Sequence, residues 1–170
     1  MKFFRLITIL FVFLGIFPIQ KSVFSESQNP KNYKILSSTN KKLSVANVES
    51  YIKEGDKLIK SGDFEKAKKT YDKARDLAKK LALFYRDLNG QFTGIDARIP
   101  IEMGNKGKAS SKIWAKSNSR LAALYIRKKE PEVAVPLLVE IIRLMKPNSS
   151  EGKEAYKTLL ELGFVETSYK

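Results

Sequence analysis

The chain has 170 residues, about the length of one domain, and it contains neither cysteine nor histidine. These absences exclude zinc-finger ligand sets, thiol catalysis, histidine-dependent nucleophile pairs and disulfide bonds. The net charge of +14 comes from 25 lysines and only 7 arginines, and arginine is the residue that forks onto phosphate and stacks on bases. We therefore expect an acidic protein or an anionic membrane surface as partner, and no nucleic acid.

The first 25 residues have the pattern of a secretory signal peptide. Lys2 and Arg5 form a basic start, an apolar run of 14 residues covers 6–19, and Val23 and Ser25 frame a cleavage point. The run is shorter than the roughly 20 apolar residues that span a membrane. The sequence predicts export to a bacterial periplasm or a thylakoid-type lumen. Residues 1–25 are then either cleaved off or kept as an N-terminal membrane anchor.

Helical patterns follow a polar segment, 26–46, which is typical of a flexible linker. The strongest pattern runs from Phe64 to Leu88, where apolar residues recur at alternating steps of three and four over about seven turns. Asp63 and Asn47 are suitable N-caps for this helix and for the one before it. The sequence predicts an all-α domain and a short tail. The domain covers 47–164, with helices at 47–61, 63–88, 111–128, 131–146 and 151–162, and the tail covers 165–170.

Residues 89–108 contain four glycines and one proline and show no period, so we expect an irregular loop there. Long loops are often functional, and this one supplies the candidates for an enzymatic alternative: Asp87, Asp96 and Glu102, with Tyr85 and Arg98. Paired carboxylates perform acid–base work when they lie across a cleft. No phosphate-binding glycine loop, metal-ligand cluster or nucleophile elbow is present in the sequence, so we expect no cofactor, no metal and no catalysis.

Small and aromatic residues in the first two helices follow a specific spacing over 48–81. They are Tyr51, Gly55, the turn Gly62-Asp63-Phe64-Glu65, Ala67, Tyr71 and Ala74. This segment resembles one tetratricopeptide repeat, in which small residues let two antiparallel helices approach and aromatics fill the space beside them. Lys79 departs from the family pattern, which usually has proline there, and this lets the second helix run on.

Residues 115–147 resemble a second, more divergent copy of the repeat. Its matching packing residues are Ala122, Tyr125, Ala134, Leu138 and Ile141, and Pro147 closes the unit. The helix at 151–162 then resembles the solvating cap that such arrays need. The resemblance implies antiparallel helix–turn–helix repeats that form a short α-solenoid of about two repeats plus a capping helix. Since about three repeats are usually needed for stability, a homo-oligomer is one way to cover the incomplete array.

In this family, the exposed face of the first helix of each repeat lines a groove for extended peptides. Carried onto this chain, the groove positions are Glu49, Ile52, Lys53, Asp56, Ile59 and Lys60, then Lys116, Ser119, Arg120, Ala123, Ile126 and Arg127. The resemblance implies that Lys116 and Arg120 form half of a carboxylate clamp. The lysines and arginines would make the groove basic over an apolar floor of Ile52, Ile59 and Ile126. We therefore expect a non-catalytic adaptor or assembly factor, similar to small exported bacterial proteins of this family, that binds acidic and partly apolar segments.

A membrane-surface role is the alternative that the lysines of the second predicted helix leave open. Six of them lie opposite its apolar stripe: Lys66, Lys68, Lys69, Lys73, Lys79 and Lys80. Each lysine near anionic lipid would contribute about 1 kcal/mol, and an uncleaved N-terminal segment would hold the protein there.

Overall fold

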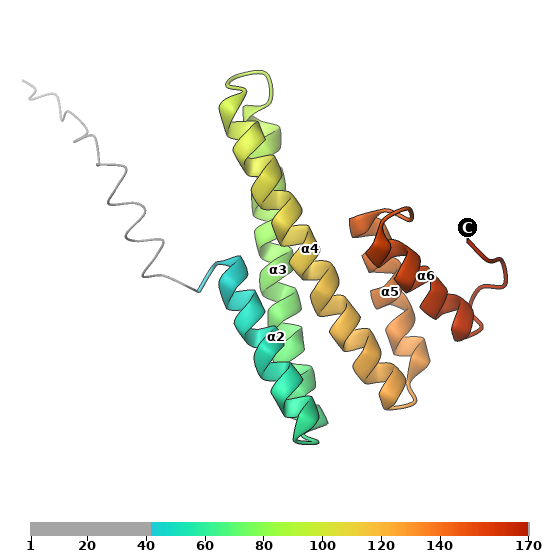
Figure 1. Ribbon diagram of the computed structural model, residues 1–170. Coiled ribbons are helices and arrows are strands. Elements are labelled where there is room, and N and C mark those ends of the chain that lie inside the picture. The colour runs from blue at the N-terminus through green and yellow to red at the C-terminus, as the bar shows by residue number, and fades with distance from the viewer. Residues whose placement is uncertain (1–41, 170) are drawn as a thin grey trace, which may run out of the picture.

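The computed structural model describes residues 42–169, which are helical and contain no strand (Figure 1). The expected signal peptide or anchor at 1–25 and most of the expected linker lie outside the described residues. The helices are α2 (Val45–Lys60), α3 (Phe64–Phe92), α4 (Arg98–Arg127), α5 (Pro131–Met145) and α6 (Ser150–Glu161). The prediction of an all-α fold is confirmed.

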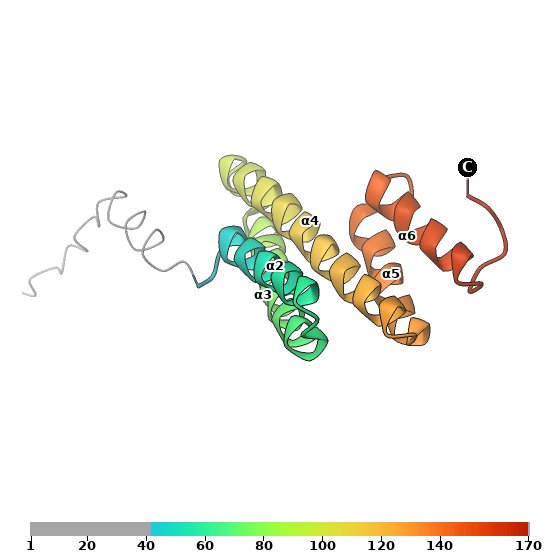
Figure 2. The ribbon, with the colours of Figure 1, turned by 60° about the horizontal axis from the view of Figure 1, so that its bottom comes forward.

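Each helix packs against the next one in the chain, and α2 also contacts α4. Figures 1 and 2 show α2, α3 and α4 side by side, with α5 and α6 on the other side of α4. Two apolar clusters form the core. One joins α2, α3 and α4, and the other joins the start of α3 to α4, α5 and α6. Since α4 contributes to both clusters, it is the central element of the fold.

Side-chain caps fix where three helices begin. The Asp63 carboxylate accepts a hydrogen bond from the Lys66 backbone N–H at 3.1 Å, as its sequence position predicts. Ser149 caps α6 in the same way through the N–H of Gly152. The prediction that Asn47 caps the first helix is wrong. The cap is Ser44, whose hydroxyl accepts a hydrogen bond from the Asn47 N–H, and α2 begins at Val45.

The irregular loop expected at 89–108 is not present. Only residues 93–97 lie between α3 and α4, and the rest of the segment extends these helices to 29 and 30 residues. Gly104 and Gly107 face α3, since a Cβ atom on them would lie 3.4 Å from Asn89 Nδ2 and 3.7 Å from Tyr85 Cβ. Asn89 also donates a hydrogen bond to the Pro100 carbonyl at 2.7 Å. The close helix–helix approach therefore outweighs the low helix propensity of glycine.

The residues predicted to pack the two helical pairs lie in the core or against it. Eight are buried: Gly55, Ala67, Tyr71, Ala74, Ala122, Ala134, Leu138 and Ile141. Three aromatics, Tyr51, Phe64 and Tyr125, are half-buried and pack on the core clusters. A very close contact joins α2 to α3, where a Cβ atom on Gly55 would come closer than 3.0 Å to three carbons of the Tyr71 ring. Only glycine fits at this position.

Replacing Gly55 by alanine should therefore lower the free energy of unfolding by about 2 kcal/mol. Overpacking against a buried ring costs more than the roughly 1 kcal/mol by which alanine favours a helix over glycine. Urea unfolding measures the difference. Gly90→Ala is the matched control, because its Cβ would meet nothing within 4 Å and the change should stabilise α3 by about 0.5–1 kcal/mol. A Gly55→Ala chain as stable as the original would contradict the close contact.

Candidate functional site

Two adjoining cavities follow the exposed face of α4. The larger, of about 810 Å³, is lined by α4 and α6, with part of α5 and the start of α2. The smaller, of about 410 Å³, lies between α2, α3 and the C-terminal half of α4. Ala123 lines both cavities. We call the two together the α4 groove.

The smaller cavity is organised around the Asp56 carboxylate. The Tyr71 hydroxyl donates a hydrogen bond of 2.6 Å to Asp56 Oδ1, and the Arg120 Nε lies 2.9 Å from the same oxygen. Tyr71 reaches Asp56 because its ring lies directly against Gly55, the residue before Asp56. Asp56 thus connects α2, α3 and α4 and fixes the guanidinium of Arg120 at the cavity wall.

The smaller cavity has more positive than negative charge. Three cations line it, Lys60, Arg120 and Arg127, and Asp56 is the one carboxylate among the lining residues. Lys60 and Arg127 are exposed, and Arg127 lies 5.9 Å from the centre of the Phe64 ring. Ile59 adds an apolar surface beside them. This combination suits an anionic group with an apolar neighbour.

The larger cavity combines an apolar floor with charged rims of both signs. Lys112 and Lys116 line it from α4, Glu151, Glu154 and Glu161 from α6, and Glu49 from α2. Lys112 Nζ lies 3.6 Å from Glu151 Oε1, so one ion pair connects the two rims. The α4 groove as a whole is therefore not uniformly basic.

The predicted groove residues divide between the two cavities. Ile59, Lys60, Arg120 and Arg127 line the smaller one, whereas Lys116 and Ile126 line the larger one. Lys116 and Arg120, the expected half of a carboxylate clamp, line different cavities, and Arg120 contacts Asp56.

Two other predicted groove residues lie outside both cavities. Lys53 is exposed and lines neither of them. The prediction that Ile52 lines the groove is wrong, because this side chain is only 2% exposed and belongs to the core. One helical turn separates Ile52 from the buried Val48 and Gly55, so all three share the inner face of α2.

Sequence reasoning missed the carboxylates of α6. The helix was expected to be a solvating cap, and acidic residues on such a cap carry no sign of facing a cavity. Their spacing is the signal that was available. Glu151, Glu154 and Glu161 are separated by three and seven residues, which places them on one helical face, together with Ala155 and Thr158.

The carboxylates proposed for an enzyme are each occupied by a neighbouring cation. Asp96 Oδ2 lies 2.7 Å from Arg98 Nη2, and this contact lowers the pKa of Asp96. Asp87 pairs with Arg86, and Glu102 pairs with Lys106, which also lies near the Tyr85 ring. Within residues 42–169, no group of three acidic side chains is placed to hold a metal ion.

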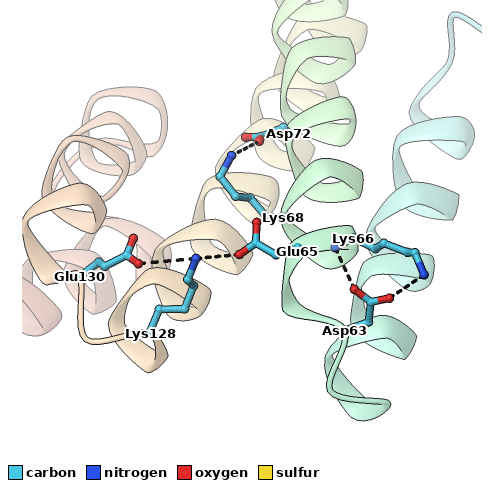
Figure 3. A network of polar contacts seen from close by, with 7 residues as sticks. All are labelled: Asp63, Glu65, Lys66, Lys68, Asp72, Lys128 and Glu130. Carbon is cyan, nitrogen blue, oxygen red and sulfur yellow. Dashed lines mark hydrogen bonds and ion pairs between the residues drawn. The ribbon is translucent and has the colours of Figure 1, made fainter.

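Several lysines of α3 are also engaged locally. Lys66 pairs with Asp63 at 2.8 Å and Lys68 with Asp72 at 3.2 Å (Figure 3), and Lys79 lies over the Trp114 ring at 5.8 Å. These contacts reduce the free positive charge that α3 offers to a lipid surface. None of the described helices is long and apolar enough to cross a membrane.

A second polar network joins the turns of the two helical pairs. Lys128, directly after α4, lies 2.9 Å from Glu65 at the start of α3 and 3.5 Å from Glu130 (Figure 3). The Lys128 ammonium group lowers the pKa of Glu65 below its ordinary 4.5. The network holds the start of α3 beside the end of α4, at the same end of the molecule as the smaller cavity.

Comparison with known proteins gave no relative: no protein-family model matches the chain, and neither a curated protein nor a solved structure is significantly similar to it.

Tyr71 should remain protonated at a pH where other tyrosines ionise. Its burial and its hydrogen bond to Asp56 raise its pKa above the ordinary 10.0. Because the folded pKa lies above the unfolded one, the stability from the neutral phenol is complete below pH 10 and is lost as the pH rises through the folded pKa. In an absorbance titration, the tyrosinate signals of the unchanged chain and of its Tyr71→Phe variant should be equal up to about pH 10 and differ only above it. If the variant already lacked the signal of one tyrosinate at that pH, the buried hydrogen bond would be contradicted.

Proposed function

We propose that this protein is a non-catalytic interaction module of the tetratricopeptide type, acting as an adaptor or assembly factor. It binds an extended segment of a partner protein in the α4 groove. The observation that carries the proposal is the location of the cavities. They follow the outer faces of α2 and α4, to which the family resemblance assigns peptide binding. Ten of the twelve positions carried over line them, and Ile52 and Lys53 do not.

The smaller cavity supports an acidic residue of the partner as one contact. Arg120 is held in place by Asp56 before any ligand arrives, so little side-chain entropy is lost when it binds. Lys60 and Arg127 are exposed beside it, without a carboxylate partner among the described residues. Charge-assisted hydrogen bonds from such cations to a carboxylate are stronger than those between neutral groups.

The expected export of the chain is compatible with this role and remains part of the proposal. The basic and apolar pattern of residues 1–25 supports secretion or N-terminal anchoring, and the module would then meet its partners in a periplasm or a thylakoid-type lumen. Fold alone names no process, so the partner must be found by experiment.

A photocrosslinker placed at Ala123 tests the proposal in cells that express the chain natively. Ala123 is exposed and lines both cavities, so we expect a crosslinked partner from this position. Asp76, exposed on α3, should give none. Lys60→Gln with Arg127→Gln should reduce the crosslinked product about tenfold, because two cationic contacts are lost.

The matched control is Lys69→Gln with Lys73→Gln, which removes the same charge from exposed positions of α3 outside both cavities. Its crosslinking yield should equal that of the unchanged chain. Equal products from Ala123 and Asp76, or a yield that Lys60→Gln and Arg127→Gln leave unaltered, would contradict binding in the α4 groove.

A further inference from the structure

We propose that the bound segment carries charges of both signs: an acidic residue in the smaller cavity, and basic residues around an apolar side chain in the larger one. This inference rests on the proposed function and names the chemistry of the partner. It differs from the expectation of an acidic segment in a basic groove.

The floor of the larger cavity is suited to an apolar side chain. Ile113, Leu138, Ile141 and Ala155 line it, and each is at most 5% exposed. They come from three different helices, so the floor is set by the packing of the fold. An apolar side chain that enters the cavity loses water-exposed surface, which is favourable in proportion to the area buried.

The rims of this cavity select positive charge beside that apolar residue. Four carboxylates and two ammonium groups line it, and Lys112 is already paired with Glu151. Glu49 and Glu154 are exposed and form no ion pair within residues 42–169, so both carboxylates are available to a ligand. A lysine or arginine of the partner would therefore be attracted to this end of the groove.

The larger cavity sets a minimum length for the segment. The larger cavity follows α4 from Ala109 to Ile126, which is about 25 Å at 1.5 Å per residue. An extended peptide rises about 3.3 Å per residue, so about eight residues cover this distance. Glu151 is held beside Lys112 near the middle of α4, whereas Arg127 ends that helix. The basic part of the segment thus lies toward the middle of α4, and its acidic part lies toward the C-terminal end of that helix.

Peptide selection tests this inference without knowledge of the natural partner. Random displayed peptides of about ten residues, long enough for the groove, are selected on the full chain immobilised by a C-terminal tag. We expect enriched peptides with an acidic residue toward one end, and an apolar residue with lysine or arginine toward the other. For one synthesised peptide, Glu49→Gln with Glu154→Gln should raise the Kd about tenfold in fluorescence anisotropy.

The control variant is Glu54→Gln with Glu166→Gln, which removes two exposed carboxylates that line neither cavity and should leave the Kd unchanged. Enriched peptides that are only acidic, weakened by Lys60→Gln with Arg127→Gln but not by Glu49→Gln with Glu154→Gln, would overturn this inference and leave the proposed function intact. Peptides whose Kd neither pair of substitutions changes, or a selection that enriches no peptide, would overturn both the inference and the proposed function.

Two further results would assign the larger cavity to the chain itself and also overturn the inference. One is enrichment of peptides that match residues 26–41. The other is a dimer in sedimentation that Glu49→Gln with Glu154→Gln dissociates, because the groove would then hold a second copy.

Discussion

The close approach of α2 and α3 at Gly55 is the constraint on which the rest of the site depends. The absence of a side chain at this position lets the Tyr71 ring lie against the α2 backbone. The Tyr71 hydroxyl then reaches Asp56, and Asp56 in turn holds Arg120 of α4. One packing contact between two helices thus determines where a third helix presents its guanidinium group. Three consecutive contacts thus connect the packing of α2 on α3 to the wall of the smaller cavity.

The charge of the chain and the charge of its groove are different properties. The net charge of +14 belongs to the whole sequence, and many of its lysines lie on exposed faces away from the cavities. Around the larger cavity, carboxylates outnumber ammonium groups, whereas cations dominate the smaller one. Local composition around a cavity decides which ligand fits, and long-range net charge affects mainly the rate of encounter.

Much of the helical architecture follows from local sequence patterns. The apolar stripe from Phe64 to Leu88 and the cap at Asp63 depend on residues within a few positions of one another, and the structure contains both. The extension of α3 and α4 through the glycine-rich segment could not be predicted in this way. Each glycine lowers helix propensity by about 1 kcal/mol, and the compensating contact with Asn89 or Tyr85 exists only after the two helices pack.

The candidate site shows the same division between local and tertiary information. Lys60, Arg120 and Arg127 were predicted from the resemblance alone, and all three line the smaller cavity. The position of Ile52 in the core and the pairing of Arg120 with Asp56 depend on how α2 is rotated against its neighbours. The carboxylates of α6 enter the groove only because α5 turns that helix back toward α4. Relations between distant segments of this kind have no signature in a single sequence.

The position of Lys128 has a mechanical consequence. This side chain links the start of α3 to the turn before α5, whereas α6 packs on α5. Lys128 therefore restrains the start of α3 relative to the turn before α5, next to Arg127 at the end of the smaller cavity. Lys128 is 26% exposed and its two partners more so, so dissolved ions weaken these contacts. Ionic strength would then act on this restraint as well as on the attraction of a ligand to the groove.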